Sequence, residues 1–358
     1  MTAYDLGARH LCRGILAHPL GLHCEVPPGR DTSGDLADIS GFLDGLGRAV
    51  EHVKQGTVFL DTADSYGCGH SERMIGRFVR ERPDVPLYLS SKVGRVRGSA
   101  PHPFADRHIH HQFEQSLENL YAEQLDLYTL ESFDFGPADR YLGNAIDAMR
   151  TLRELESIKA IGMRGPYADY ASSPAEWEAQ AERFLYLFRL IKPDVVWTRF
   201  NAFTPAVLLD GEDLFSFTAR NGVGLVLAAP LAHGVLTGAG GRTGRSPSHP
   251  HRTASQSLAR STPLLTKRIA EGLQRLRNTF DSAPGTLTRL ALRSCLQRGD
   301  NCVVVVGFSN GEQVEENYSC LGPALTEHEL AVVDEIYGHL RDGLQADAPR
   351  LVTEGARV

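Results

Sequence analysis

The stretch between residues 58 and 76, VFLDTADSYGCGHSERMIG, decides the fold that this sequence predicts. The short apolar run over 58–60 is typical of a buried strand, and it ends at a dense group of polar residues that begins with Asp61. A helical pattern of apolar residues starts near residue 71, after two glycines. Strand, polar loop and helix therefore form one supersecondary unit, with Asp61 and Tyr66 at the carboxyl end of the strand.

The same alternation of strand and helix continues along the chain. Strands are expected at 13–21, 58–60, 86–91, 125–130, 157–163, 193–200, 223–228 and 302–306. Helices are expected at 35–53, 106–121, 138–155, through Trp177 to Ile191, and at 208–220, 266–280 and 286–298. Several strands are unbroken apolar runs, which is typical of a parallel sheet buried on both faces. We therefore predict an α/β fold, a (β/α)8 TIM barrel, as one domain over residues 1–358.

Three segments of this domain are distinctive. Residues 1–55 carry the least defined pattern, because a proline-rich loop follows the first expected strand. A long Gly/Ser/Pro/His-rich loop at 238–255, after the seventh strand, is either a lid over a ligand or a mobile excursion. A C-terminal helix precedes a flexible tail at 346–358.

Composition narrows the class of partner. The 358 residues carry a formal net charge of -7 with both signs interspersed, which argues against a nucleic-acid surface or a polybasic membrane patch. No run of 18 apolar residues and no apolar leader occur. The six cysteines form no CxxC pair, which favours reduced thiols in a cytoplasm over a disulfide framework or a metal site. Small molecules are the expected partners.

Charged residues close four of the expected strands. Asp61, Lys92, Glu131 and Arg164 each follow or end an apolar run. In a (β/α)8 barrel the active site lies at the carboxyl ends of the strands, so these side chains would converge there. The pattern predicts an enzyme.

Five motifs resemble the aldo-keto reductases over residues 56–340. They are LDTADSYG with the trailing SERMIG, the lysine at the end of SSK, LDLY in the fourth strand, AAPLAHGVLTG after the seventh, and VVGFSNGEQVEEN at the eighth. The wording is most similar to the L-galactose and aldose dehydrogenase branch. The resemblance implies a nicotinamide cofactor, NAD(P)H, bound across the barrel mouth.

The resemblance also implies roles for individual residues. Tyr66 is the proton donor or acceptor, and Lys92 and Asp61 tune its acidity, since a phenol with a pKa of about 10 must be lowered toward working pH. The implied cofactor contacts are Arg164, Pro230, Leu231, Gly234, Leu236, Gly307, Ser309, Gln313 and Asn317.

Glu131 is the largest departure from the family pattern, because the fourth catalytic position there is a histidine. The steroid 5β-reductase branch also carries glutamate at this position and reduces a conjugated carbon–carbon double bond. A protonated Glu131 would donate a hydrogen bond beside Tyr66, so we expect reduction of an enone or a related carbonyl. An aldose dehydrogenase using NAD is the alternative within the same class.

Arg164, Trp197 and Ala228 replace residues that contact the nicotinamide in many family members. Arg164 could pair with Glu131 and keep it ionised, which would abolish the donor role. Alternatively, Arg164 or Arg199 binds an anionic group of the substrate, and Trp197 lines the substrate pocket. A binding barrel without redox chemistry is the hypothesis from another class.

The adenosine end bears on the choice between NAD and NADP. No Lys or Arg lies between Gly307 and Glu316, and a 2'-phosphate normally needs such a charge. The sequence favours NAD, unless Arg242 or Arg245 of the long loop supplies the charge.

Overall fold

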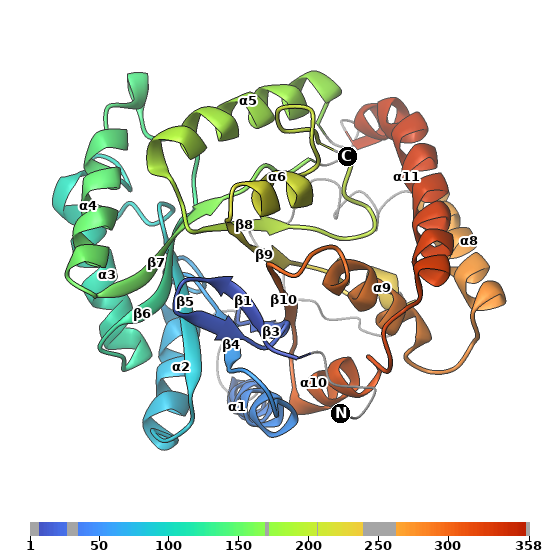
Figure 1. Cartoon of the computed structure of the whole chain (residues 1–358), viewed down its shortest axis with the longest axis horizontal. Coiled ribbons are helices and arrows are strands. Elements are labelled where there is room, and N and C mark those ends of the chain that lie inside the picture. The colour runs from blue at the N-terminus through green and yellow to red at the C-terminus, as the bar shows by residue number, and fades with distance from the viewer. Residues whose placement is uncertain (1–6, 27–34, 169–171, 206, 239–262, 356–358) are drawn as a thin grey trace.

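The computed structural model describes residues 7–26, 35–168, 172–205, 207–238 and 263–355. Its centre is a closed barrel of parallel strands in the order β10-β3-β4-β5-β6-β7-β8-β9, which confirms the predicted fold (Figure 1). The barrel strands are β3 (Leu20–His23), β4 (Val58–Asp61), β5 (Leu87–Val93), β6 (Leu125–Leu130), β7 (Ile158–Arg164), β8 (Val195–Arg199), β9 (Gly224–Ala228) and β10 (Cys302–Gly307).

Helices surround these strands (Figure 1). They are α1 (Asp35–His52), α2 (His70–Glu81), α3 (Asp106–Leu120), α4 (Leu142–Glu154), α5 (Pro174–Ile191), α6 (Leu214–Arg220), α8 (Pro263–Thr279), α9 (Thr286–Leu296), α10 (Gly311–Ser319) and α11 (Glu327–Gly355). Short 3-10 turns lie at Pro137–Asp139 and Val235–Thr237. The tail expected over 346–358 is helical as far as Gly355, because α11 continues through it. No helix of the described residues is long and apolar enough to cross a membrane.

The first strand differs from the prediction. Instead of one strand over 13–21, an antiparallel hairpin of β1 (Arg9–Cys12) and β2 (Ile15–Ala17) precedes the barrel strand β3. Leu11 and Ile15 of this hairpin are buried in the same cluster as the inward-facing residues of the barrel. The apolar residues over 13–21 are therefore divided between two elements. Those of β2 belong to the hairpin that closes the amino-terminal end of the barrel, and only those from Leu20 onward enter the barrel sheet.

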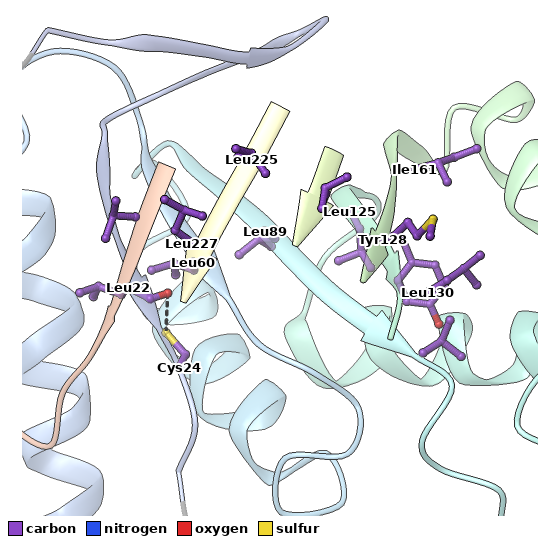
Figure 2. Close-up of a cluster of buried hydrophobic side chains, with 14 of the residues drawn as sticks. Leu22, Cys24, Leu60, Leu89, Leu125, Tyr128, Leu130, Ile161, Leu225 and Leu227 are labelled. Carbon is purple, nitrogen blue, oxygen red and sulfur yellow. Dashed lines mark hydrogen bonds between the residues drawn. The ribbon is translucent and has the colours of Figure 1, made fainter. Parts of the chain in front are cut away.

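The barrel has two apolar layers, because side chains alternate between its two faces. The outward layer packs strands against helices and includes Leu60, Tyr128 and Ile161, as Figure 2 shows. The inward layer includes Phe59, Leu127 and Ala160. This alternation determines which residues face the interior at the carboxyl ends of the strands.

A second core lies where α8, α9 and α11 pack together beside the barrel (Figure 1). Leu236, Leu273 and Tyr337 are buried there, between the loop after β9 and these three helices. The loop predicted at 238–255, with Arg242 and Arg245, lies outside the described residues except for Gly238.

Candidate active site

The inward alternation brings charged side chains together at one end of the barrel. Asp61 and Arg199 come two residues beyond the inward-facing Phe59 and Trp197. Lys92, Glu131 and Arg164 come four residues beyond the inward-facing Tyr88, Leu127 and Ala160, which is the same face again. Because all the strands are parallel, their carboxyl ends meet at the same mouth. The four strand-end residues predicted from the sequence are therefore neighbours around one opening.

Asp61 is the centre of the first group of contacts. Its Oδ2 atom lies 2.9 Å from Lys92 Nζ, 2.9 Å from His23 Nδ1 and 3.0 Å from Trp197 Nε1. Its Oδ1 atom accepts a hydrogen bond from Ser90 Oγ at 3.2 Å. The side chains of Asp61 and Lys92 are fully buried, so this carboxylate depends on its partners for stabilisation.

The pKa values of this group follow from these partners. Burial alone would raise the pKa of Asp61, but the charge of Lys92 and the hydrogen bond from His23 outweigh it and hold the pKa below its usual range. Burial alone would lower the pKa of His23, but its bonds to Asp61 and Glu25 raise it instead. His23 therefore carries a positive charge over more of the pH range than an exposed histidine.

Sequence reasoning missed His23, and it gave Trp197 a different role. His23 ends β3, and its ring meets the ring of Tyr66 edge-on at a centroid distance of 5.4 Å. Placing the first barrel strand at 20–23 would have identified it by the same strand-end rule. Trp197, predicted to line the substrate pocket, is buried and bonds Asp61. Trp197 therefore helps to hold the carboxylate of Asp61 in place.

Tyr66 lies against this group, with only 6% of its surface exposed. Lys92 Nζ lies 5.0 Å from the centroid of the Tyr66 ring and also donates to the Thr62 carbonyl oxygen at 2.6 Å. Among the described residues, the Tyr66 hydroxyl has no hydrogen-bond partner. It is therefore available to a substrate.

The expected acidity of Tyr66 needs correction. Its pKa lies well above its usual value, because burial disfavours the phenolate and the negative charges of Glu131 and Asp61 add to this effect. Arg199 acts in the opposite direction but does not reverse the shift. The hydroxyl is thus protonated at neutral pH, which is the form of a proton donor.

Glu131 forms its ion pair with a residue that the sequence did not single out. Arg95 Nε lies 3.2 Å from Glu131 Oε1, whereas the expected partner, Arg164, makes no ion pair with it. Arg95 follows β5 by two residues, after Gly94, whose φ of 119° turns the chain. Glu131 Oε2 is buried and has no hydrogen-bond partner among the described residues. One oxygen is thus paired and the other is available as an acceptor.

Arg164 and Arg199 complete the mouth. They are the last residues of the adjacent strands β7 and β8, and both are partly buried. Burial lowers the pKa of Arg164 to about 10, with repulsion from Arg95 adding to the effect and Glu131 opposing it.

Nothing in the described ranges groups three or more His, Cys, Asp or Glu side chains in a way that could hold a metal ion.

Comparison with known proteins agrees with this geometry. The model of the "Aldo/keto reductase family" matches residues 46–338. The chain belongs to the aldo/keto reductase family. It is accordingly an NAD(P)-dependent oxidoreductase.

Relatives in this family are similar over most of their length. The chain is 26% identical over 298 residues to L-galactose dehydrogenase of Arabidopsis thaliana, covering 82% of this chain and 81% of the relative. It is 24% identical over 298 residues to L-glyceraldehyde 3-phosphate reductase of Escherichia coli (80% and 81%). Its fold resembles that of a glycerol dehydrogenase from Gluconobacter oxydans, with a TM-score of 0.68, 19% identity, and coverage of 95% and 96%.

The family's cofactor would have to meet the loop that follows β9. Three non-glycine residues of this loop, Ala229, Ala232 and His233, have positive φ angles, between 48° and 59°. Non-glycine residues rarely adopt this conformation, and groups of them are found at ligand-binding loops as well as at turns. Asn201 Nδ2 donates to the Ala229 carbonyl oxygen at 3.1 Å and stabilises this shape.

The predicted contacts in this loop differ in exposure. Pro230 is buried, whereas Leu231 and Gly234 are partly exposed and accessible to a ligand. Leu236 is fully buried in the second core, so its side chain supports the loop from below.

The end of β10 also fits this cofactor. A Cβ atom at Gly307 would meet no atom of the described residues within 4 Å, so the glycine leaves open space at the strand end. The α10 helix begins four residues later, where its N-terminus favours a phosphate group. Ser309 N donates to Gln313 Oε1 at 2.9 Å and orders this turn, and Asn317 is buried behind it. These four residues therefore fit the predicted adenosine end.

Proposed function

We propose that this enzyme reduces the carbonyl group of a hydroxylated, aldose-type aldehyde or ketone, with Tyr66 as the proton donor. The observation that carries this choice is the ion pair between Glu131 Oε1 and Arg95 Nε, at 3.2 Å. The pair determines what Glu131 offers to a substrate beside Tyr66. Carbonyl reduction of this kind needs Glu131 as a hydrogen-bond acceptor, whereas enone reduction, the other candidate, needs it as a donor.

Tyr66 supplies the proton in this proposal. The family's nicotinamide cofactor, when bound, would supply the hydride for the carbonyl carbon. The carbonyl oxygen takes the proton from the Tyr66 hydroxyl, which gives an alcohol and leaves a Tyr66 phenolate that regains a proton from solvent before the next turnover. The raised pKa of Tyr66 keeps its hydroxyl protonated at neutral pH, and the accessible hydroxyl makes no competing hydrogen bond to a described residue. A positioned acid of this kind contributes about 10²- to 10⁴-fold to the rate.

Glu131 acts as an acceptor in this proposal. Arg95 Nε lies at ion-pair distance from Glu131 Oε1, and a carboxylate accepts hydrogen bonds without donating them. Its Oε2 atom is buried without a partner among the described residues, an arrangement that a substrate hydroxyl would satisfy. The names of two relatives, L-galactose dehydrogenase and L-glyceraldehyde 3-phosphate reductase, also support a hydroxylated aldehyde.

Enone reduction is the second candidate, and the position of Glu131 close to Tyr66 favours it. Glu131 is 5% exposed and occupies the position of the family's catalytic histidine, where a protonated carboxyl could donate a hydrogen bond to an enone oxygen. The hydride would then add to the β-carbon of the enone, and Tyr66 would supply the proton that gives a neutral product. This mechanism needs Glu131 to donate a hydrogen bond, whereas its Oε1 atom lies 3.2 Å from Arg95 Nε, which is itself a donor.

Steady-state assays on two substrate panels separate the candidates. Aldoses and small hydroxyaldehydes would be compared with α,β-unsaturated ketones, with NADH and NADPH each tested. We expect the hydroxyaldehydes to be reduced, and Glu131→Gln to lower kcat/KM for them about tenfold, as expected for a lost charged hydrogen bond. Activity on enones alone, abolished by Glu131→Gln, would favour the second candidate. Oxidation of aldoses with NAD+ at neutral pH, without measurable reduction, would favour the dehydrogenase direction.

A further inference from the structure

Two guanidinium groups at the barrel mouth have no counter-ion among the residues that the structure describes. Within the part of the chain that the structure describes, the side chains of Arg164 and Arg199 form neither an ion pair nor a hydrogen bond. Both are partly buried, whereas arginines such as Arg77 and Arg220, which do form ion pairs, lie at the surface. A charge removed from water without a partner is unfavourable, so a functional reason is expected where a protein retains two.

The positions of Arg164 and Arg199 in the sheet direct both guanidinium groups toward the barrel mouth. Arg164 pairs with Trp197 in the register of β7 and β8, and Arg199 lies two residues beyond Trp197 on the same strand face. Trp197 points into the barrel, as its bond to Asp61 requires. Arg199 therefore lies over the barrel interior at the level of the mouth, with Arg164 on the neighbouring strand.

The charges around this position do not balance. Glu131 is the acidic neighbour of Arg164, but it is already paired with Arg95. Asp61 is already shared by Lys92, His23 and Trp197. Burial lowers the pKa of Arg164 to about 10, which still leaves the guanidinium charged at neutral pH. In the described part of the chain, both positive charges therefore lack an acidic partner, and Arg199 is close enough to Tyr66 to affect its pKa.

We infer that Arg164 and Arg199 form a subsite for an anionic group of the substrate, a carboxylate or a phosphate. A guanidinium presents its N–H groups as a planar fork that matches the oxygens of either anion. The inference rests on the proposed function, because the carbonyl of the same molecule would lie at Tyr66. The substrate is then an anionic hydroxyaldehyde or ketone, such as a sugar acid or a sugar phosphate.

Arg199 and Arg164 could instead serve the cofactor, and the experiment must separate the two uses. The sequence resemblance assigns Arg164 to the nicotinamide end, which carries a neutral amide. A cofactor role predicts that losing the guanidinium weakens NAD(P)H binding for every substrate. An anion subsite predicts a loss confined to charged substrates.

Matched substrate pairs test the subsite directly. Glyceraldehyde 3-phosphate would be compared with glyceraldehyde, and 4-carboxybenzaldehyde with its neutral methyl ester, which distinguishes a phosphate from a carboxylate. For the favoured anion, we expect kcat/KM to exceed that of the neutral partner by about tenfold to a hundredfold, the size of a charge-assisted hydrogen bond. High salt should reduce this preference.

The variants are Arg164→Gln, Arg199→Gln, Arg164→Lys and the control Arg80→Gln. The two Gln variants should bring the charged-to-neutral ratio toward one, and Arg164→Lys should retain part of it, because lysine keeps the charge but loses the fork. Arg80 is exposed on α2, away from the strand ends, and its replacement should leave the ratio unchanged. Affinity for NADPH and NADH, measured by fluorescence titration, should change little in the Gln variants.

Binding measurements keep the test independent of catalysis. In the presence of cofactor, inorganic phosphate or benzoate should raise the Tm of the wild-type enzyme and raise it less in each Gln variant. Reduction of neutral aldehydes without any anion preference would overturn the subsite but retain the proposed function. Anion binding that needs both arginines, without reduction of any aldehyde, would retain the subsite and overturn the proposed function. Loss of cofactor affinity in Arg164→Gln, with an unchanged substrate ratio, would overturn the subsite.

Discussion

The two halves of the barrel mouth differ in how far their charges are satisfied by the protein. On the side of β3, β4 and β5, one Asp61 oxygen has Lys92 and His23 within 3.0 Å, and Trp197 reaches the same oxygen from β8. On the side of β7 and β8, Arg164 and Arg199 have no ionic partner among the described residues. Glu131 lies between the halves, with one oxygen paired and one unpaired.

This difference distinguishes residues that position the catalytic groups before the substrate binds from residues whose interactions the ligand itself completes. A proton donor must have a defined position and acidity before the substrate arrives, and a saturated network around Asp61 provides both. A binding group gains most when its interactions are left for the substrate to complete. Replacing residues on the first half should therefore damage catalysis and folding, whereas replacing them on the second should alter selectivity.

The largest effect is expected from Tyr66. Tyr66→Phe removes the hydroxyl that gives the proton, so kcat should fall by about 10²- to 10⁴-fold. The hydroxyl has no hydrogen-bond partner among the described residues, so its loss should leave the Tm nearly unchanged. Steady-state kinetics and thermal unfolding check both expectations. A variant with more than about a tenth of the wild-type kcat would contradict the role of Tyr66 as the donor.

Among these variants, the largest loss in the free energy of unfolding is expected from replacing Lys92. Lys92→Met leaves the carboxylate of Asp61 buried with less compensation, which should lower the free energy of unfolding by about 3 to 5 kcal/mol. Chemical denaturation measures this value. The double variant Lys92→Met/Asp61→Asn should recover part of the loss, because it removes the charge that was left without its partner. Equal instability of the single and double variants would show that packing, and not charge, explains the loss.

His23 should give the first half a pH dependence. Its folded pKa is raised, so its contribution to stability is fully present below the unfolded value of about 6.5 and is lost as pH rises through the folded value. His23→Gln should therefore destabilise the protein by about 1 to 2 kcal/mol more at pH 6 than at alkaline pH. Denaturation at both pH values tests this, with His111→Gln, on α3, as a control. A loss that is independent of pH would mean that His23 acts as a neutral ring.

The smallest effect, and of opposite sign, is expected from Arg199. Arg199→Leu removes a partly buried charge that has no partner among the described residues, so stability should rise by about 1 kcal/mol. The gain should shrink in the presence of phosphate or benzoate, because these anions stabilise the wild type more than the variant. A clear fall in Tm without ligand would indicate that the two halves do not differ as described.

Strand-end residues were predictable wherever the strand itself was. Asp61, Lys92, Glu131 and Arg164 each follow a continuous apolar run, and parallel strands in a closed barrel bring such residues to one mouth. His23 was missed because the hairpin over Arg9–Ala17 carries apolar residues that resemble a barrel strand. The pairing of Glu131 with Arg95 was missed because it depends on a turn at Gly94.

The sequence by itself determined the barrel, the cofactor class and the residues that surround the mouth, since these depend on local periodicity and on motifs that are continuous in the chain. Only the tertiary structure decided the partners of the charges: that Asp61 is shared by three donors, that Arg95 pairs with Glu131, and that Arg164 and Arg199 have no ionic partner among the described residues. The physical reason is that an ion pair is selected by the reach of side chains across neighbouring strands, which spacing along the chain does not encode.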